Sequence, residues 1–239
     1  MQGSIGQDST VHFLYGNGLH ALWTDRSYGD LSDQRELEKI CPTRRLSWLK
    51  QIHSGKVLVV EPGQVVEGAE ADALVTADPW SCLAIRTADC APIALFSPEG
   101  IVAAVHAGWR GTLAGVIPNT VEVMRSKGST EIVAAIGPCI HLECYSFSTG
   151  DLDPLIAKFG NAIKSSDKGG QPALNLPELV AQALQKSDVQ VGMVSSRCTG
   201  CDSSYFSYRV RRDSARQALL VWRDQGTVDD QARSANSRL

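Results

Sequence analysis

The chain has 239 residues, of which 43% are hydrophobic and 21% charged, a composition typical of a well-packed soluble core. Its formal net charge of -3 excludes a general attraction to nucleic acid or anionic lipid, so we expect neither partner. The N-terminus lacks the basic and apolar regions of a signal peptide, and no run reaches the ~18 apolar residues of a membrane span. We therefore expect a cytoplasmic protein.

The seven cysteines are an odd number, which favours free thiols or a metal site in a reduced compartment over a disulfide framework. No change in composition divides the chain before its polar end. We predict a single domain over residues 1–223 and a polar, disordered tail over residues 224–239.

The first third of the chain alternates predicted strands with turns. Gly16-Asn17-Gly18 interrupts the apolar residues 11–23 and predicts a hairpin, and residues 34–41 are predicted to form a short helix that ends before Pro42. Further strands are predicted over residues 47–60, with a break after His53, and over residues 71–76 and 81–87, while residues 61–70 are predicted to be a loop.

Three polar residues in these strands have both a structural and a functional interpretation. His12 and His20 alternate with apolar neighbours and have no second ligand nearby, which favours a structural role. Asp72 is either a turn-forming side chain bonded to the backbone, which we favour, or an acid near a site.

Residues 87–112, TADCAPIALFSPEGIVAAVHAGWRGT, contain two reactive side chains. The apolar runs APIALF and IVAAV are separated by the turn residues 97–100, which indicates a hairpin of buried strands. Cys90 enters the first strand and His106 leaves the second. Because these ends of an antiparallel pair lie side by side, we predict that the thiol and the imidazole are neighbours.

The segment after His106 combines glycines, an arginine and a helical pattern. Gly108 and Gly111 permit close backbone approach, and apolar residues recur at helical spacing over residues 113–124, with Pro118 expected to kink the helix unless it starts late. The free N–H groups of a helix start and Arg110 predict an anion site over residues 108–112, including Thr112. A plain strand-to-helix connection is the alternative.

The second half is predicted to contain strands over residues 131–137, 189–195 and 218–222, helices over residues 152–163 and 175–186, and a loop over residues 165–171. Tyr208 and Arg209 belong to an aromatic and basic stretch that suits stacking of a ring and binding of an anion, although packing under a loop is nearly as plausible.

The cysteines of this half do not match a common metal-binding pattern. Cys139, His141 and Cys144 have the spacing C-x-H-x-x-C, which no common zinc site uses, and Cys198 and Cys201 form a C-x-x-C motif without a second one. We predict free, unlinked thiols at these positions.

His53, Cys90 and His106 all lie at predicted strand ends and together provide two imidazoles and one thiolate. This set fits a zinc ion held by three protein ligands with an open fourth position. In the alternative interpretation Cys90 is a nucleophile activated by His106, with Asp89 or another acid orienting the imidazole.

Several short motifs follow one another over about residues 45–222: QIH ending at His53, ADA around Asp72, TADCAP around Cys90, HAGWRG from His106, IGPCI around Cys139, RCT around Cys198 and FSYR ending at Arg209. In these motifs the sequence resembles the YfiH/laccase-domain family, whose members carry the names polyphenol oxidase, multicopper laccase-like protein and purine nucleoside phosphorylase.

The resemblance implies an α+β fold, a single domain of mixed β-sheets wrapped by helices. It implies that His53, Cys90 and His106 are metal ligands, usually for zinc. It also implies phosphorolysis of adenosine, inosine and guanosine, with some adenosine deamination and methylthioadenosine cleavage. Two departures from the family pattern are a shortened segment before Trp48 and SYRVRRD in place of SYRRD, which puts Val210 at the position of the second arginine.

Several functions remain open at this point. A multicopper laccase needs many histidines, commonly in His-x-His pairs, and this chain has five histidines and no such pair, although binding of one copper ion is possible. For phosphorolysis, Arg110 with residues 108–112 would bind phosphate, and Tyr208 and Arg209 would contact the nucleoside. For deamination, Asp89 could shuttle protons.

The alternatives are a Cys90 or zinc hydrolase acting on peptidoglycan precursors and a non-enzymatic metal-binding domain. The oligomeric state is not predicted.

Overall fold

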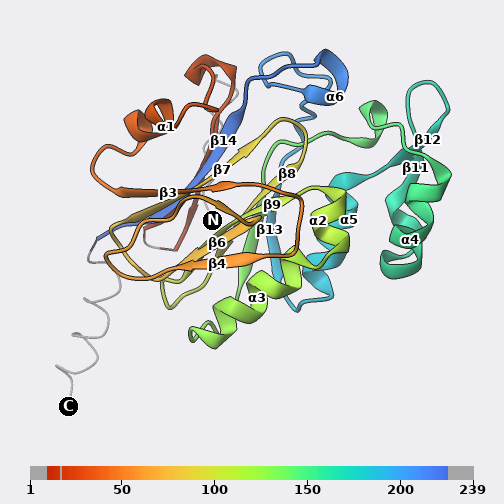
Figure 1. The fold of residues 1–239 in the computed structure, drawn as a ribbon. Helices are drawn as coiled ribbons and strands as arrows, with labels where there is room; N and C mark the ends of the chain where they lie inside the picture. The colour runs from red at the N-terminus through yellow and green to blue at the C-terminus, as the bar shows by residue number, and fades with distance from the viewer. Residues whose placement is uncertain (1–9, 17, 226–239) are drawn as a thin grey trace.

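The structure is a computed structural model that describes residues 10–16 and 18–225. Two six-stranded mixed sheets lie face to face at its centre, and helices cover their outer faces (Figure 1). The predicted α+β class with mixed sheets is confirmed.

The first sheet contains both ends of the described chain. Its order is β1 (Val11–Tyr15), β2 (Leu19–Trp23), β14 (Gln217–Arg223), β7 (Ser81–Thr87), β3 (Arg45–Lys50) and β5 (Glu67–Glu70). The strands pair antiparallel from β1 to β7, which confirms the predicted first hairpin, and parallel from β7 to β5. β5 lies inside the predicted loop over residues 61–70. Its sequence EGAE lacks apolar alternation, so only the pairing with β3 makes it a strand.

The second sheet carries the central hairpin. Its order is β13 (Gln190–Val194), β10 (Val133–Ile136), β8 (Ala91–Phe96), β9 (Val102–Ala107), β6 (Ala73–Thr76) and β4 (Val57–Val60). β8 and β9 are buried at every position, because one of their faces packs on the first sheet and the other on helices. This burial on both faces explains the continuous apolar runs in the sequence.

The helices form the outer layers on both sides of the sheets. α1 (Gln34–Ile40) packs on the first sheet, and α6 (Tyr208–Arg211) precedes β14. Four helices lie on the side of the second sheet: α2 (Trp109–Leu113), α3 (Val116–Ser126), α4 (Thr149–Phe159) and α5 (Leu176–Gln185). Short 3₁₀ turns occupy Arg26–Tyr28, Leu142–Cys144 and Asn161–Ile163.

Three local predictions need correction. The helix expected after His106 is two helices, divided by the left-handed Gly115. The second helix starts late, the alternative allowed for Pro118, so this proline lies in the first turn of α3 and breaks no hydrogen bond. The loop predicted over residues 165–171 is the connection of a hairpin, β11 (Lys164–Ser166) and β12 (Pro172–Leu174). The helix predicted over residues 152–163 starts earlier, with Ser148 as its N-cap, and ends at Phe159.

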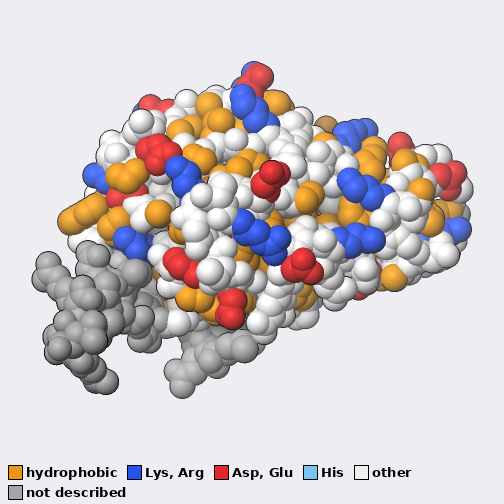
Figure 2. Space-filling view, turned by 90° about the horizontal axis from the view of Figure 1, so that it is seen from below, with side chains coloured by type: hydrophobic (Ala, Val, Ile, Leu, Met, Phe, Trp, Pro, Cys, Tyr) orange, Lys and Arg blue, Asp and Glu red, His pale blue; other side chains and the backbone are white. Residues whose placement is uncertain are grey.

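Residues 226–239 of the predicted tail lie outside the described residues. Asp224, at its start, belongs to the fold, because its carboxylate pairs with His20 at 2.9 Å and with Arg44 at 3.5 Å. His20 also stacks on Trp222, which agrees with the structural role expected for it. No helix in residues 10–16 and 18–225 is long and apolar enough to cross a membrane. On the face shown in Figure 2, acidic and basic side chains are interspersed.

Candidate active site

The central hairpin brings Cys90 and His106 together as predicted. In the register of β8 and β9, Ala91 pairs with Ala107 and Pro92 with His106, so the two reactive side chains lie at the same end of the strand pair. His106 is 4% exposed, and Cys90 is partly exposed at the floor of a cavity.

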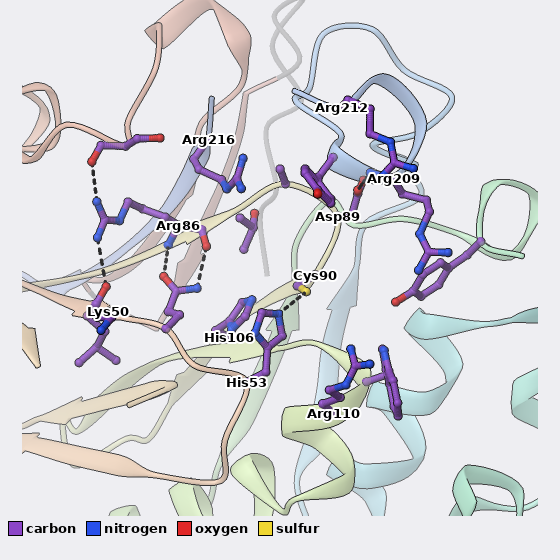
Figure 3. Close-up of a pocket in the computed structure, with 18 residues that line it drawn as sticks. Lys50, His53, Arg86, Asp89, Cys90, His106, Arg110, Arg209, Arg212 and Arg216 are labelled. Atoms are coloured by element: carbon purple, nitrogen blue, oxygen red, sulfur yellow. Dashed lines mark hydrogen bonds between the residues drawn. The ribbon is translucent and has the colours of Figure 1, made fainter. Parts of the chain in front are cut away.

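His53 completes the cluster from the loop between β3 and β4. Its Nε2 lies 3.8 Å from Cys90 Sγ, and its ring packs edge-on against the ring of His106 with 4.9 Å between centroids. The ligand atoms of His53, Cys90 and His106 all lie within 4.8 Å of one another. Figure 3 shows the three side chains converging beneath the cavity.

Asp72 holds two of these residues in place. Its Oδ1 accepts hydrogen bonds from the backbone N–H of His53 and from Nδ1 of His106, both at 2.9 Å, and its Oδ2 accepts from the N–H and hydroxyl of Ser54. Because Nδ1 of His106 is engaged with the carboxylate, Nε2 is left for the cluster. Asp72 is therefore both of the things proposed from the sequence, a backbone-bonding side chain and an acid next to the site.

The charges of the cluster stabilise one another. Burial would raise the pKa of Cys90, but His106 and His53 beside the thiol lower it to about 6. Burial would lower the pKa of His106, but the Cys90 thiolate and Asp72 raise it to about 9. Asp72 is buried, yet the hydrogen bonds from His106 and Ser54 lower its pKa to about 2. At neutral pH the cluster thus contains a thiolate, which is the form that binds metals and attacks electrophiles.

Gly108 permits the close approach of these groups. A Cβ at this position would lie 2.8 Å from Cys90 Sγ and 3.1 Å from His53 Cδ2. We expect Gly108→Ala to displace both side chains and to weaken metal binding by at least about tenfold, measured by competition with a chelator. Gly150→Ala is the control, because a Cβ there meets no atom within 4 Å. Equal metal affinity of the two variants would contradict this role.

The cluster lies in a cavity of about 670 Å³ lined by residues from both sheets and from α2 and α6. Its walls are rich in cations: Arg86, Arg110, Arg209, Arg212 and Arg216 all line it. None of these five arginines forms an ion pair with a carboxylate in the part of the chain that the structure describes. A cavity with this unbalanced positive charge is suited to bind an anion.

The acid that orients the imidazole of His106 is Asp72 and not Asp89, the acid named for this role from the sequence. The side chain of Asp89 is buried, and its carboxylate accepts hydrogen bonds from Thr199 Oγ1 at 2.8 Å and from the backbone N–H of Arg209 at 2.6 Å. These bonds connect the Cys90 loop to α6. Asp89 thus fixes the position of Arg209 relative to the cluster.

Backbone strain is concentrated around this cavity. Four non-glycine residues in the described chain have a positive φ, and His53 (59°), Asp89 (102°) and Arg212 (58°) are three of them and line the cavity. Such conformations are costly and persist only where the surrounding contacts enforce them, a common property of functional sites.

Most of the predicted site residues line the cavity, but Gly108, Gly111 and Thr112 of the predicted anion site do not. His53, Asp89, Cys90, His106, Arg110, Tyr208 and Arg209 all contribute to the lining. Gly111 instead packs against the carbonyl of Ser54, Thr112 is 1% exposed, and α2 has only five residues. Gly108, Gly111 and Thr112 are therefore packing positions, and the positive charge comes from arginine side chains.

The cavity also contains residues that the sequence analysis did not assign to a site. Tyr145, Trp109, Arg212 and Arg216 form part of its wall. The concentration of basic residues over 209–216 was the available signal for the two arginines. No sequence motif marked Tyr145 as a site residue, and its neighbours in the sequence do not line the cavity.

The donor set fits a zinc ion. Two imidazoles and a thiolate converge within bonding range, one face of the cluster is open to the cavity, and His106 has the carboxylate partner typical of a metal-binding histidine. Two imidazoles and one thiolate also suit a single copper ion, but the five histidines of the chain are too few for a copper cluster in addition.

Comparisons with known proteins agree with these observations. A family model described as multi-copper polyphenol oxidoreductase laccase matches residues 31–224. A protein named purine nucleoside phosphorylase from Streptomyces coelicolor is 35% identical over 92% of this chain and 100% of its own length. A protein with the same name, YfiH from Escherichia coli, is 31% identical over 73% of this chain and 72% of its own.

Solved structures show the same fold. The YfiH protein from Bacillus licheniformis superposes with a TM-score of 0.79 at 24% identity and covers 93% of this chain and 99% of its own. Protein NMB0706 from Neisseria meningitidis has a TM-score of 0.77 at 24% identity, over 91% of this chain and 100% of its own.

Proposed function

We propose that this protein is a zinc-dependent purine nucleoside phosphorylase. The chain belongs to the family described as multi-copper polyphenol oxidoreductase laccase, which is the YfiH family predicted from its motifs. The observation that carries the proposal is the combination of a His53, Cys90 and His106 cluster with a cavity lined by arginines that have no carboxylate partner among the described residues. The names of the relatives support the same reaction.

The phosphate would bind to arginine side chains. Arg110 on α2 and Arg209 on α6 flank the space beside Cys90 in Figure 3. Arg110 stacks on Trp109 at 4.1 Å and Arg209 lies over Tyr145 at 4.9 Å, so the aromatic rings orient both guanidinium groups without neutralising them. Planar guanidinium groups held in this way suit bidentate binding of phosphate oxygens.

Aromatic side chains would hold the nucleoside. Tyr145, Trp109 and the 53% exposed Tyr208 line the cavity and offer flat apolar surfaces to a purine ring. Burial raises the pKa of Tyr145, and the Cys90 thiolate raises it further, so its hydroxyl keeps its proton at neutral pH. The hydroxyl can therefore donate a hydrogen bond to the departing base.

In the reaction, a phosphate oxygen forms a bond to C1′ of the ribose while the bond from C1′ to the purine nitrogen breaks. The purine leaves with the bonding electron pair and takes up a proton from water. Arg110 and Arg209 hold the attacking phosphate, and Tyr145 stabilises the negative charge that develops on the base. A zinc ion at His53, Cys90 and His106 would supply a Lewis acid next to the reacting sugar or base.

The test is release of hypoxanthine from inosine and phosphate by the purified, zinc-loaded full chain, with adenosine, guanosine and methylthioadenosine as further substrates. Phosphate-dependent release of the free base with ribose 1-phosphate supports the proposal. Release of ammonia from adenosine reports the proposed side deaminase activity. Absence of base release from every nucleoside would exclude the proposal and leave the hydrolase, the copper oxidase or a non-enzymatic metal-binding role.

The arginines give a more specific prediction. We expect Arg209→Gln and Arg110→Gln each to raise the KM for phosphate by roughly 10- to 100-fold, the loss of charge-assisted hydrogen bonds, with a smaller change in the KM for inosine. Arg125→Gln, on the outside of α3, is the matched control. An unchanged KM for phosphate in both cavity variants would remove these arginines from the phosphate site.

A further inference from the structure

Three cysteines form a second cluster behind the wall of the cavity. Cys144 ends the 3₁₀ turn Leu142–Cys144, and Cys198 and Cys201 belong to the loop that follows β13. Their sulfur atoms lie within 4.8 Å of one another, and Cys144 Sγ and Cys201 Sγ are 3.2 Å apart. All three are free thiols, as predicted from the sequence. The fold nevertheless brings their sulfur atoms together in one cluster.

A backbone N–H group from a neighbouring segment points at the sulfur of Cys198. The backbone N–H of His141 donates to Cys198 Sγ at 3.3 Å. A backbone N–H group that donates to a sulfur stabilises negative charge on it, and a thiolate is the form in which cysteine binds metals.

Gly200 and the charged side chains around the cluster also favour metal binding. A Cβ at Gly200 would lie 2.7 Å from Cys144 Cβ and 3.0 Å from Cys144 Sγ, so only glycine lets the third cysteine approach the C-x-x-C loop. Lys168 Nζ lies 3.3 Å from Cys201 Sγ and offsets negative charge. Glu143 offers a fourth donor, with its Oε1 3.5 Å from Cys201 Sγ.

We propose that Cys144, Cys198 and Cys201 bind a zinc ion at a second, structural site, with Glu143 as the fourth ligand. Tetrahedral zinc with Zn–S bonds of ~2.3 Å places its sulfur ligands about 3.8 Å apart, within the spread of these three atoms. Binding releases the thiol protons to solvent and converts the cysteines into thiolate ligands.

This second zinc ion would hold the wall of the active cavity. Cys144 directly precedes Tyr145, which lines the cavity. Thr199, inside the C-x-x-C loop, donates to Asp89 next to Cys90, and Arg211 of α6 donates to the carbonyls of Thr199 and Gly200. One ion at the three cysteines therefore ties together the segments that carry Tyr145, Asp89 and Arg209.

The experiment counts zinc in the full chain, purified under reducing conditions and freed of loosely bound metal. We expect about two zinc ions per wild-type chain and about one in Cys201→Ser, an exposed position whose change leaves the core intact. We expect about one in Cys90→Ala, which leaves the second cluster untouched, and none in the double variant. Cys139→Ala, a buried cysteine near the cluster that contributes no ligand to it, should keep two.

Cobalt and a chelator give independent measurements on Cys90→Ala. Cobalt bound to this variant should give the intense near-ultraviolet thiolate charge-transfer absorption of a three-cysteine site, and a chelator should lower its Tm. Glu143→Gln should weaken zinc binding while the cobalt absorption from the thiolates remains.

Two outcomes would overturn the proposal. One is a single zinc ion in the wild type and none in Cys90→Ala. The other is a disulfide between Cys144 and Cys201 in freshly alkylated protein, found by mass spectrometry without reduction, since it would show that the close pair is a redox pair. The zinc count does not depend on the reaction, so failure of the phosphorolysis assay leaves this test intact.

Discussion

Cys90→Ala is expected to lose the metal of the active cavity and to lower inosine phosphorolysis by roughly 10³-fold. Cys90 is the only thiolate of this cluster, and the charge on its sulfur offsets the positive charge of the bound ion. Lewis-acid stabilisation is worth several kcal/mol of transition-state energy, and each 1.4 kcal/mol corresponds to about a tenfold change in rate. The measurements are kcat/KM with inosine and phosphate, and the metal content of the variant.

The control is Cys41→Ala, which removes a buried thiol at the C-terminal end of α1, next to Cys82 of β7 in the first sheet. It should keep the metal and the activity of the wild type. A Cys90→Ala variant that binds metal normally yet loses activity would instead indicate a nucleophilic thiol. A variant that loses the metal and keeps full activity would show that phosphorolysis needs only the arginines and the aromatic wall.

Asp72→Asn is expected to weaken metal binding by about 10- to 100-fold and to reduce the free energy of unfolding by roughly 3–5 kcal/mol. The carboxylate is fully buried and accepts bonds from four donors, two on each oxygen. Asparagine replaces one of the two carboxylate oxygens with an NH₂ group, which cannot accept a hydrogen bond. The donors that face that oxygen, either the two of Ser54 or those of His53 and His106, then lose their acceptor. Chemical denaturation and chelator competition measure the two effects.

Asp78→Asn separates the two consequences. Asp78 is also buried, at 3% exposure, and accepts from Arg45, from Ser81 and from the backbone N–H of Trp80, but it does not line the cavity. It should lose stability and keep its metal affinity. If both variants lose stability and neither loses metal, Asp72 supports the fold without positioning the ligands.

The elements that form from neighbouring residues were predictable from the sequence. The turn at residues 97–100 between two apolar runs indicates a hairpin, and the pairing of Pro92 with His106 follows from it. The N-cap Asn175 and the apolar spacing behind it likewise predict α5. Each of these patterns lies within a short stretch of sequence, so the order and spacing of its residues are enough to predict the element. They were sufficient to bring Cys90 and His106 together.

The segments that pair over long distances were not predictable in this way. β5 and the β11–β12 hairpin have weak strand patterns and form because a partner strand is available. The division of the segment after His106 into two helices, α2 and α3, depended on Gly115 and its left-handed backbone conformation.

The sequence by itself determined the hairpin with its thiol and imidazole, most of the strands and helices, and, through its motifs, the family. Only the tertiary structure decided that Asp72 orients His53 and His106, that Gly108, Gly111 and Thr112 are packing positions, and that arginine side chains of the cavity wall supply the positive charge. It also brought Cys144 to the C-x-x-C loop. The physical reason is that hydrogen bonds and charges act between atoms that the fold brings together from segments far apart in the sequence, and no local pattern encodes those distances.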